Sequence, residues 1–139
     1  MGDGHLEKRN SGIRLKLEQC GRNVEYLMWF HKFLAERGYC NNKIPKLGIR
    51  IGEEGKIFYH YKINSFTFNN LNWIYNMFYI RDELNNQTTK IVPSNLMCFF
   101  SPLAIAIWFM NNGSKTSHSV KIATNGFTPS EVYTLCHLF

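Results

Sequence analysis

A strict alternation of apolar and charged side chains near the N-terminus constrains the fold more than any other feature of the chain. In the run from Ile13 to Gln19, positions 13, 15 and 17 are apolar, and charged residues (Arg14, Lys16, Glu18) alternate with them. A period of two places the apolar groups on one face of an extended strand and the charged groups on the other. The segment therefore predicts a half-buried strand whose solvated face is rich in cations.

Two hairpins are expected to form an antiparallel sheet. Residues 5–9 precede the alternating strand and join it through Asn10-Ser11-Gly12, which is a favourable hairpin connection. A second pair of strands is predicted at 47–51 and 56–68, on either side of the turn residues 52–55.

Helices are expected after each hairpin. Asn23 as a capping residue and Gly38 as a stop predict a helix over 24–37. Residues 70–79 predict a short aromatic helix, and 81–90 have the composition of a polar loop.

The last third of the chain predicts two further helices and a strand. Ser101-Pro102 is typical of a helix start, and the helix 103–110 is apolar all round, so it is expected to be buried on most sides. A short strand is predicted at 118–124, and Thr128-Pro129-Ser130-Glu131 has the pattern of a capping box. The order of elements predicts an α+β fold with an antiparallel sheet.

The charge of the chain favours a polyanionic partner. Its net charge is +6, and the segment 7–50 alone holds ten basic and four acidic residues. This balance favours nucleic acid first and an anionic membrane surface second, and a solvated basic surface is the simplest alternative. The four cysteines lack the spacing of a zinc site, and the longest apolar run, 96–110, is too short to predict a membrane span.

Composition also suggests where the gene resides. Asparagine occurs fifteen times and alanine four times, and Phe, Ile, Tyr and Lys are abundant. These residues have AT-rich codons, so we expect an organellar gene and a mitochondrial protein, with the chloroplast as the less favoured alternative.

Several segments resemble the motifs of one protein family, in the family's order. The run P-L-A-I-A-I-W-F-M-N-N-G, residues 102–113, resembles the second motif of LAGLIDADG homing endonucleases and related intron maturases, which read L-A-x-W-F-M-D-D-G there. G-D-G-H at 2–5 resembles the end of the first motif. Weaker matches at 17–27, 90–93 and 126–132 extend the resemblance over essentially the whole chain.

The resemblance implies a saddle-shaped fold. In this family two pseudo-symmetric α/β repeats each carry an antiparallel sheet with helices on one face, and the polar face of the sheet lies on the DNA major groove. We expect a single domain over 1–139, with a first repeat at about 1–93 and a truncated second repeat at about 94–139. A protein partner is expected to cover the truncated repeat.

The resemblance also implies where a metal would bind. In this family each motif ends in a carboxylate that helps hold a divalent metal, which polarises a phosphate and activates water. Asp3 matches the ligand of the first motif, but Asn112 stands at the ligand position of the second and offers only a neutral carbonyl. Gln19 matches a polar position near the family's active site. We expect Asp3 to be a vestigial metal ligand, and Mg²⁺ to be required only if endonuclease activity remains.

Cations near the predicted sheet are the candidate nucleic-acid contacts. They are Lys8, Arg9, Arg14, Lys16, Arg22, Arg50 and Lys62. Lys90 is interpreted as a solvated lysine.

Three functions remain open from the sequence. The first is a non-cleaving protein that binds structured RNA in an organelle, as an intron maturase or an accessory protein of ribosomal RNA. The second is one part of a split, Mg²⁺-dependent DNA endonuclease. The third is a scaffold that docks another protein.

Overall fold

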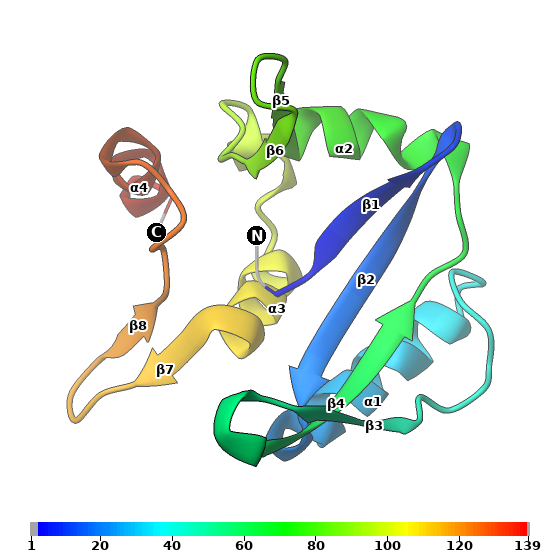
Figure 1. Ribbon diagram of the computed structural model, residues 1–139. Coiled ribbons are helices and arrows are strands. Elements are labelled where there is room, and N and C mark those ends of the chain that lie inside the picture. Colours follow the sequence, from blue (N-terminus) through cyan, green and yellow to red (C-terminus); the bar gives the residue numbers. More distant parts are fainter. Residues whose placement is uncertain (1–2, 139) are drawn as a thin grey trace. The chain divides into compact units, whose positions relative to one another are not determined.

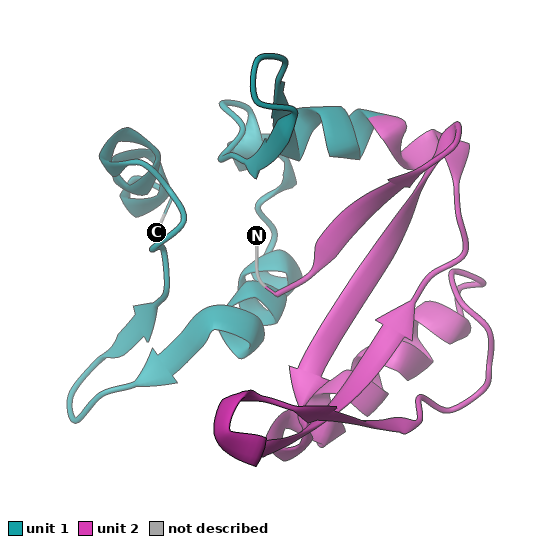
Figure 2. Ribbon diagram, in the orientation of Figure 1, with its two compact units in different colours: residues 1–2, 73–139 teal, residues 3–72 magenta. Residues whose placement is uncertain are grey.

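The computed structural model describes residues 3–138 (Figure 1). They form two compact units, which Figure 2 colours separately. We call Asp3–Asn72 the N-terminal unit and the residues from Trp73 onward the C-terminal unit. Each unit is described by itself, and the repeat boundary near residue 93 stays a prediction.

The N-terminal unit is built on a four-stranded antiparallel sheet with the order β1-β2-β4-β3. Its strands are β1 (His5–Arg9), β2 (Gly12–Cys20), β3 (Leu47–Ile51) and β4 (Ile57–Asn64). Both predicted hairpins are therefore confirmed. The last strand ends at Asn64 rather than at 68, and Phe68 instead pairs with Ile13 through an isolated bridge.

The strand β3 lies at one edge of this sheet. The turn η2 (Glu53–Gly55) joins it to β4, with Gly55 at φ +75°, a conformation that glycine adopts without strain. Two isoleucines of the edge strand are largely exposed, Ile49 at 61% and Ile51 at 73%. This end of the hairpin therefore presents apolar side chains to solvent.

The helix α1 (Val24–Ala35) packs against the apolar face of the sheet. Leu17 and Ile63 from the strands and Leu27 from the helix are at least 98% buried, and they form the core of the unit. The helix is two residues shorter than predicted. Gly38 follows the helix and reverses the chain as predicted, because its φ of +75° lets the N–H of Tyr39 donate to the carbonyl of Leu34 at 2.9 Å.

The predicted side-chain cap at Asn23 is wrong. Asn23 does precede α1, but it belongs to the 3₁₀ turn η1 (Gly21–Asn23), which gives it φ −102° and ψ 19°. A capping side chain needs extended backbone at this position to reach the free N–H groups of the first turn. The amide of Asn23 instead donates to Oε1 of Gln19 at 2.9 Å.

Short elements make up the C-terminal unit. After the 3₁₀ turn η3 (Asn69–Leu71), the chain forms α2 (Asn72–Phe78), β5 (Tyr79–Asp82), β6 (Gln87–Lys90), the turn η4 (Leu96–Phe99), α3 (Pro102–Asn112), β7 (Gly113–Lys115), β8 (Val120–Ile122) and α4 (Pro129–Cys136). The predicted short helix and the predicted late strand are confirmed, although both are shorter than expected. The strand β8 pairs with β7, which the sequence did not predict.

The predicted polar loop at 81–90 is wrong, because β5 and β6 pair there as a hairpin. The residues from Ile80 to Thr89 are exposed on both faces of the two strands. A strand that buries neither face needs no alternation of apolar and polar residues, so the pattern that reveals other strands is absent.

The helix α3 begins as predicted but is not buried as predicted. Its start is fixed by Ser101, whose hydroxyl oxygen accepts from the N–H of Ala104 at 3.2 Å. Trp108 is buried in the core of the unit with Val92, Leu96 and Leu135. This core contacts only one side of the helix, and Leu103 and Met110 remain about half exposed.

The capping box of α4 is confirmed. The hydroxyl oxygen of Thr128 accepts from the N–H of Glu131 at 3.3 Å, and the Glu131 carboxylate accepts from the N–H of Thr128 at 2.8 Å. The second carboxylate oxygen accepts from the N–H of Val92, also at 2.8 Å, so the cap ties the helix to an earlier segment. None of the helices between residues 3 and 138 has the length and apolar character that crossing a membrane requires.

Candidate nucleic-acid interface

The strand register gathers cations on the face of the sheet that α1 does not cover. Residues paired directly across an antiparallel ladder share a face. Glu7 pairs with Arg14, Glu18 with Lys62, and Phe58 with Arg50. We call this surface the polar face; its charged residues are Glu7, Arg9, Arg14, Lys16, Glu18, Arg50 and Lys62.

One carboxylate holds three of these cations together. Glu7 accepts hydrogen bonds from Arg9 Nε at 2.8 Å, Arg14 Nε at 3.0 Å and Lys16 Nζ at 3.1 Å. The hydrogen bond from Arg9, followed by those from Lys16 and Arg14, lowers the pKa of Glu7 to about 2. The cluster therefore keeps a net charge of about +2 at neutral pH and orders its cations before any ligand arrives.

The other two cations of the polar face are held less tightly. Lys62 lies 4.0 Å from Glu18, and both side chains are about half exposed, so the pair contributes little to stability. The guanidinium of Arg50 lies 5.8 Å from the ring centre of Phe58. Both cations are free to turn toward a phosphate.

Two of the predicted contacts lie elsewhere. Lys8 pairs with the fully buried Ile13, so the register places it on the α1 side of the sheet rather than on the polar face. Arg22 lies beyond the end of β2, where its Nε donates to Cys20 Sγ at 3.4 Å. This hydrogen bond lowers the pKa of the Cys20 thiol. Arg22 therefore borders the polar face and does not lie on it.

Asp3 and Gln19, which the sequence singled out separately, are in contact. Gln19 is 4% exposed, and its Nε2 donates to Asp3 Oδ2 at 2.6 Å while its Oε1 accepts from Asn23. A pocket of about 320 Å³ lies here, and Arg50 and His60 are among its other lining residues. The chain of hydrogen bonds from Asn23 through Gln19 fixes the orientation of the Asp3 carboxylate.

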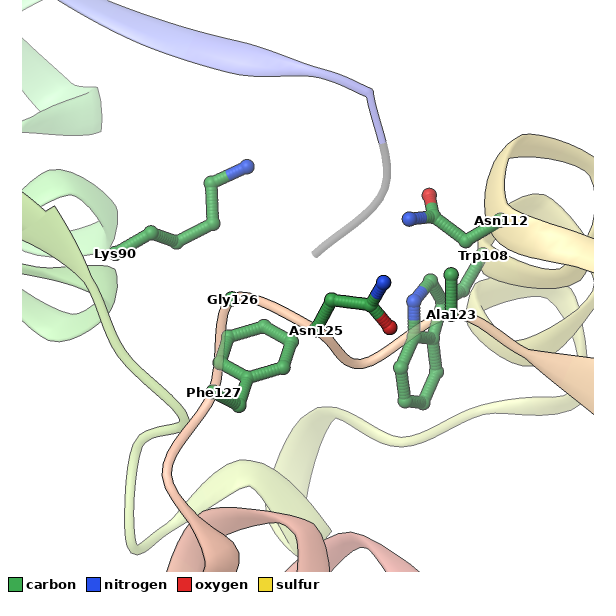
Figure 3. A pocket seen from close by; sticks show the side chains of 7 residues that line it. All are labelled: Lys90, Trp108, Asn112, Ala123, Asn125, Gly126 and Phe127. Atoms are coloured by element: carbon green, nitrogen blue, oxygen red, sulfur yellow. The ribbon is translucent and has the colours of Figure 1, made fainter.

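Asn112 lines a pocket of about 270 Å³ in the C-terminal unit (Figure 3). Figure 3 shows the Asn112 amide and the Lys90 ammonium directed into this space, with Asn125 beside them. The buried Oδ1 of Asn112 has no hydrogen-bond partner in the part of the chain that the structure describes. The sequence predicts a solvated Lys90 and gives no signal for Asn125, and both side chains line this pocket.

The donor set does not fit a strongly held Mg²⁺. The two positions that the family motif assigns to metal ligands carry one carboxylate, Asp3, and one neutral amide, Asn112, where hard divalent cations favour charged oxygen ligands. Within residues 3–138, no three His, Cys, Asp or Glu side chains are grouped so that they could hold a metal.

Comparison with known proteins gives relatives over nearly the whole chain. The chain is 38% identical over 140 residues to a cytochrome b mRNA maturase bI2 of Saccharomyces cerevisiae, covering 99% of this chain and 33% of that protein. It is 40% identical over 134 residues to the maturase of the same name from Debaryomyces hansenii, covering 95% of this chain and 49% of that protein. The chain therefore spans between a third and a half of the length of these relatives.

An endonuclease and a solved structure extend the comparison. An intron-encoded endonuclease ai4 of Dictyostelium discoideum is 32% identical over 111 residues, covering 78% of this chain and 67% of that protein. The structure of the homing endonuclease I-WcaI bound to its DNA recognition sequence shares the fold, with a TM-score of 0.76, 19% identity and coverage of 99% of this chain and 60% of that one. The model of the LAGLIDADG DNA endonuclease family matches residues 1–139, and with these relatives it shows that the chain belongs to that family.

Proposed function

We propose that this chain is the nucleic-acid-binding part of an intron maturase, which binds structured RNA and does not cut DNA. One observation carries the proposal: the cations of the polar face are assembled and ordered, while Asn112 replaces a charged ligand with a neutral one. Cationic side chains on a sheet suffice for phosphate binding, whereas hydrolysis needs a positioned metal. The maturase relatives support RNA as the ligand.

The test compares RNA and DNA ligands of the same protein. The purified chain is titrated with a folded fragment of a cytochrome b intron and with a DNA duplex of matching length, at several salt concentrations. Tighter binding of the RNA, and intact DNA after incubation with Mg²⁺, are the expected results. Equal affinity for both ligands, together with cut DNA, would refute the proposal.

We also propose a mitochondrial site of action and a covering partner for α3. The abundance of residues whose codons are AT-rich and the cytochrome b maturase relatives support the location. The exposed Leu103 and Met110 support the partner, because exposed apolar side chains on one helix favour burial. The portion of the maturases that lies outside the matched region is the first candidate to test for binding to α3.

A second candidate function is DNA cleavage as part of a larger or split endonuclease. The contact between Asp3 and Gln19 favours it, because the carboxylate is held in a fixed orientation. In this case Asn112→Asp is expected to raise Mg²⁺-dependent cleavage, and Asp3→Asn is expected to abolish it. Both variants should bind RNA as the unchanged protein does if the maturase function is correct.

A further inference from the structure

A further pocket lies at the edge of the N-terminal sheet. It has a volume of about 250 Å³, and it opens where β4 continues past the end of its pairing with β3, since Leu47 and Tyr61 are the last pair. Its lining includes Lys62 and Asn64 from β4 and residues 40, 41 and 43–46 from the segment between α1 and β3. The pocket therefore lies beside the polar face and shares Lys62 with it.

The loop that forms the pocket is held in place by hydrogen bonds. His31 is 8% exposed, and its Nε2 donates to the carbonyl of Asn41 at 3.0 Å, because a carbonyl can only accept. The side chain of Asn41 accepts from the N–H of Lys43 at 2.9 Å, and the buried Cys40 lies against the same helix. The amino groups on this loop are thus carried by anchored backbone rather than by a free segment.

The side chains that line the pocket carry positive charge. Three lysines line it (Lys43, Lys46 and Lys62), and no Asp or Glu does. Lys62 has a distant partner in Glu18, whereas neither Lys43 nor Lys46 has a carboxylate within 4.0 Å among residues 3–138. The Glu7 cluster differs from this pocket, because there a carboxylate already binds the cations.

We infer that this edge pocket binds a backbone phosphate of the nucleic acid, so that the interface continues from the polar face around the edge of β4. The inference rests on the proposed binding function. The volume of the pocket is many times the roughly 15 Å³ that a single water requires, so a phosphate and part of its sugar can enter. Lysine suits this ligand because its ammonium acts as a point charge with three donors.

The test measures how the affinity for a short RNA hairpin depends on salt. Lys43→Gln and Lys46→Gln are each expected to reduce the slope of log affinity against log salt by about one, which is the loss of one phosphate contact. Lys32→Gln is the matched control: Lys32 lies on α1, is 77% exposed and is 3.8 Å from Glu36. Its slope is expected to stay unchanged.

A second arm separates this inference from the proposed function. Inorganic phosphate is added to the unchanged protein while the side-chain signals of Lys43 and Lys46 are followed by NMR. If phosphate shifts these signals but RNA does not bind, the pocket's affinity for phosphate stands and the proposed function fails. If Arg14→Ala lowers the slope but neither Lys43→Gln nor Lys46→Gln does, the function stands and the pocket is refuted. Loss of binding to anionic vesicles alone in the two variants would also refute it, by assigning the pocket to a lipid headgroup.

Discussion

Glu7 determines how much positive charge the polar face presents. Its carboxylate neutralises one of the three cations that it binds. We expect Glu7→Gln to keep the shape of the side chain, raise the affinity for RNA and steepen its salt dependence by about one log–log unit. Titration at several salt concentrations measures both, with Glu36→Gln, directly after α1, as the control. Weaker binding by Glu7→Gln would mean that ordering of the cations outweighs their charge.

The same residue sets a pH range for the first hairpin. Its pKa is lowered from 4.5 to about 2 in the folded chain, so the charged form is favoured by folding. The resulting stabilisation is complete above the unfolded value and is lost as the pH falls toward about 2. An NMR titration of the Glu7 carboxyl carbon should give a midpoint well below the ordinary glutamate value of 4.5. A midpoint near the ordinary glutamate value would show that the ion pairs do not persist in solution.

Asn23 is expected to act through Gln19 rather than through the helix terminus. Losing either a cap or a hydrogen bond to Gln19 costs about 1 kcal/mol, so the single variant cannot tell them apart. A double-mutant cycle of Asn23→Ala and Gln19→Leu, followed by chemical unfolding, can do so. We expect a coupling energy of about 0.5 kcal/mol or more. Strictly additive losses would instead support a cap that is independent of Gln19.

At the scale of elements, the capping box of α4 gives the sharpest prediction. Thr128→Ala removes the acceptor for the N–H of Glu131 and should lower the free energy of unfolding by about 1 kcal/mol. Thr128→Ser keeps the hydroxyl and should retain most of the stability. Glu131→Ala should cost more than Thr128→Ala, because it also releases the N–H of Val92. Thermal or urea unfolding measures all three variants.

The sequence predicted those elements whose residue pattern depends only on their local environment. The alternation in β2 indicates a strand with one buried face, and the Thr128–Glu131 capping box indicates a helix start. The structure has both. The hairpin of β5 and β6 is exposed on both faces from Ile80 to Thr89, so these residues show no alternation that would predict strands. The apolar sequence of α3 indicates that this helix packs against other elements. It does not indicate how many sides of the helix are covered.

Among the site residues, too, a local pattern predicts the positions of some, whereas the positions of others depend on strand pairing. The alternation in β2 correctly predicted that Arg14 and Lys16 share one face of the sheet. The position of Lys8 on the other face depends on the strand register, which is set by pairing across the hairpin. The contact between Asp3 and Gln19 joins positions sixteen residues apart. No spacing along the chain could have predicted it without the strand pairing.

For the whole molecule, the face assignment predicts an asymmetric response to loss of charge. Arg14→Ala and Lys16→Ala should each weaken RNA binding and reduce its log–log salt dependence by about one. Lys8→Ala should change that dependence much less, because its side chain lies on the α1 side of the sheet. The three variants are compared by RNA titration from low to moderate salt. Equal losses in all three would indicate that net charge matters and the face does not.

The exposed isoleucines of β3 have a consequence for how this protein behaves at high concentration. An edge strand with bare apolar side chains can pair with the same strand of another molecule, and like charges normally oppose that approach. Salt screens those charges, so raising the ionic strength should promote self-association through Ile49 and Ile51. Light scattering is expected to rise with salt for the unchanged protein and to stay low for Ile51→Lys. The Ile51→Lys variant would therefore remain dispersed over a wider range of salt concentrations.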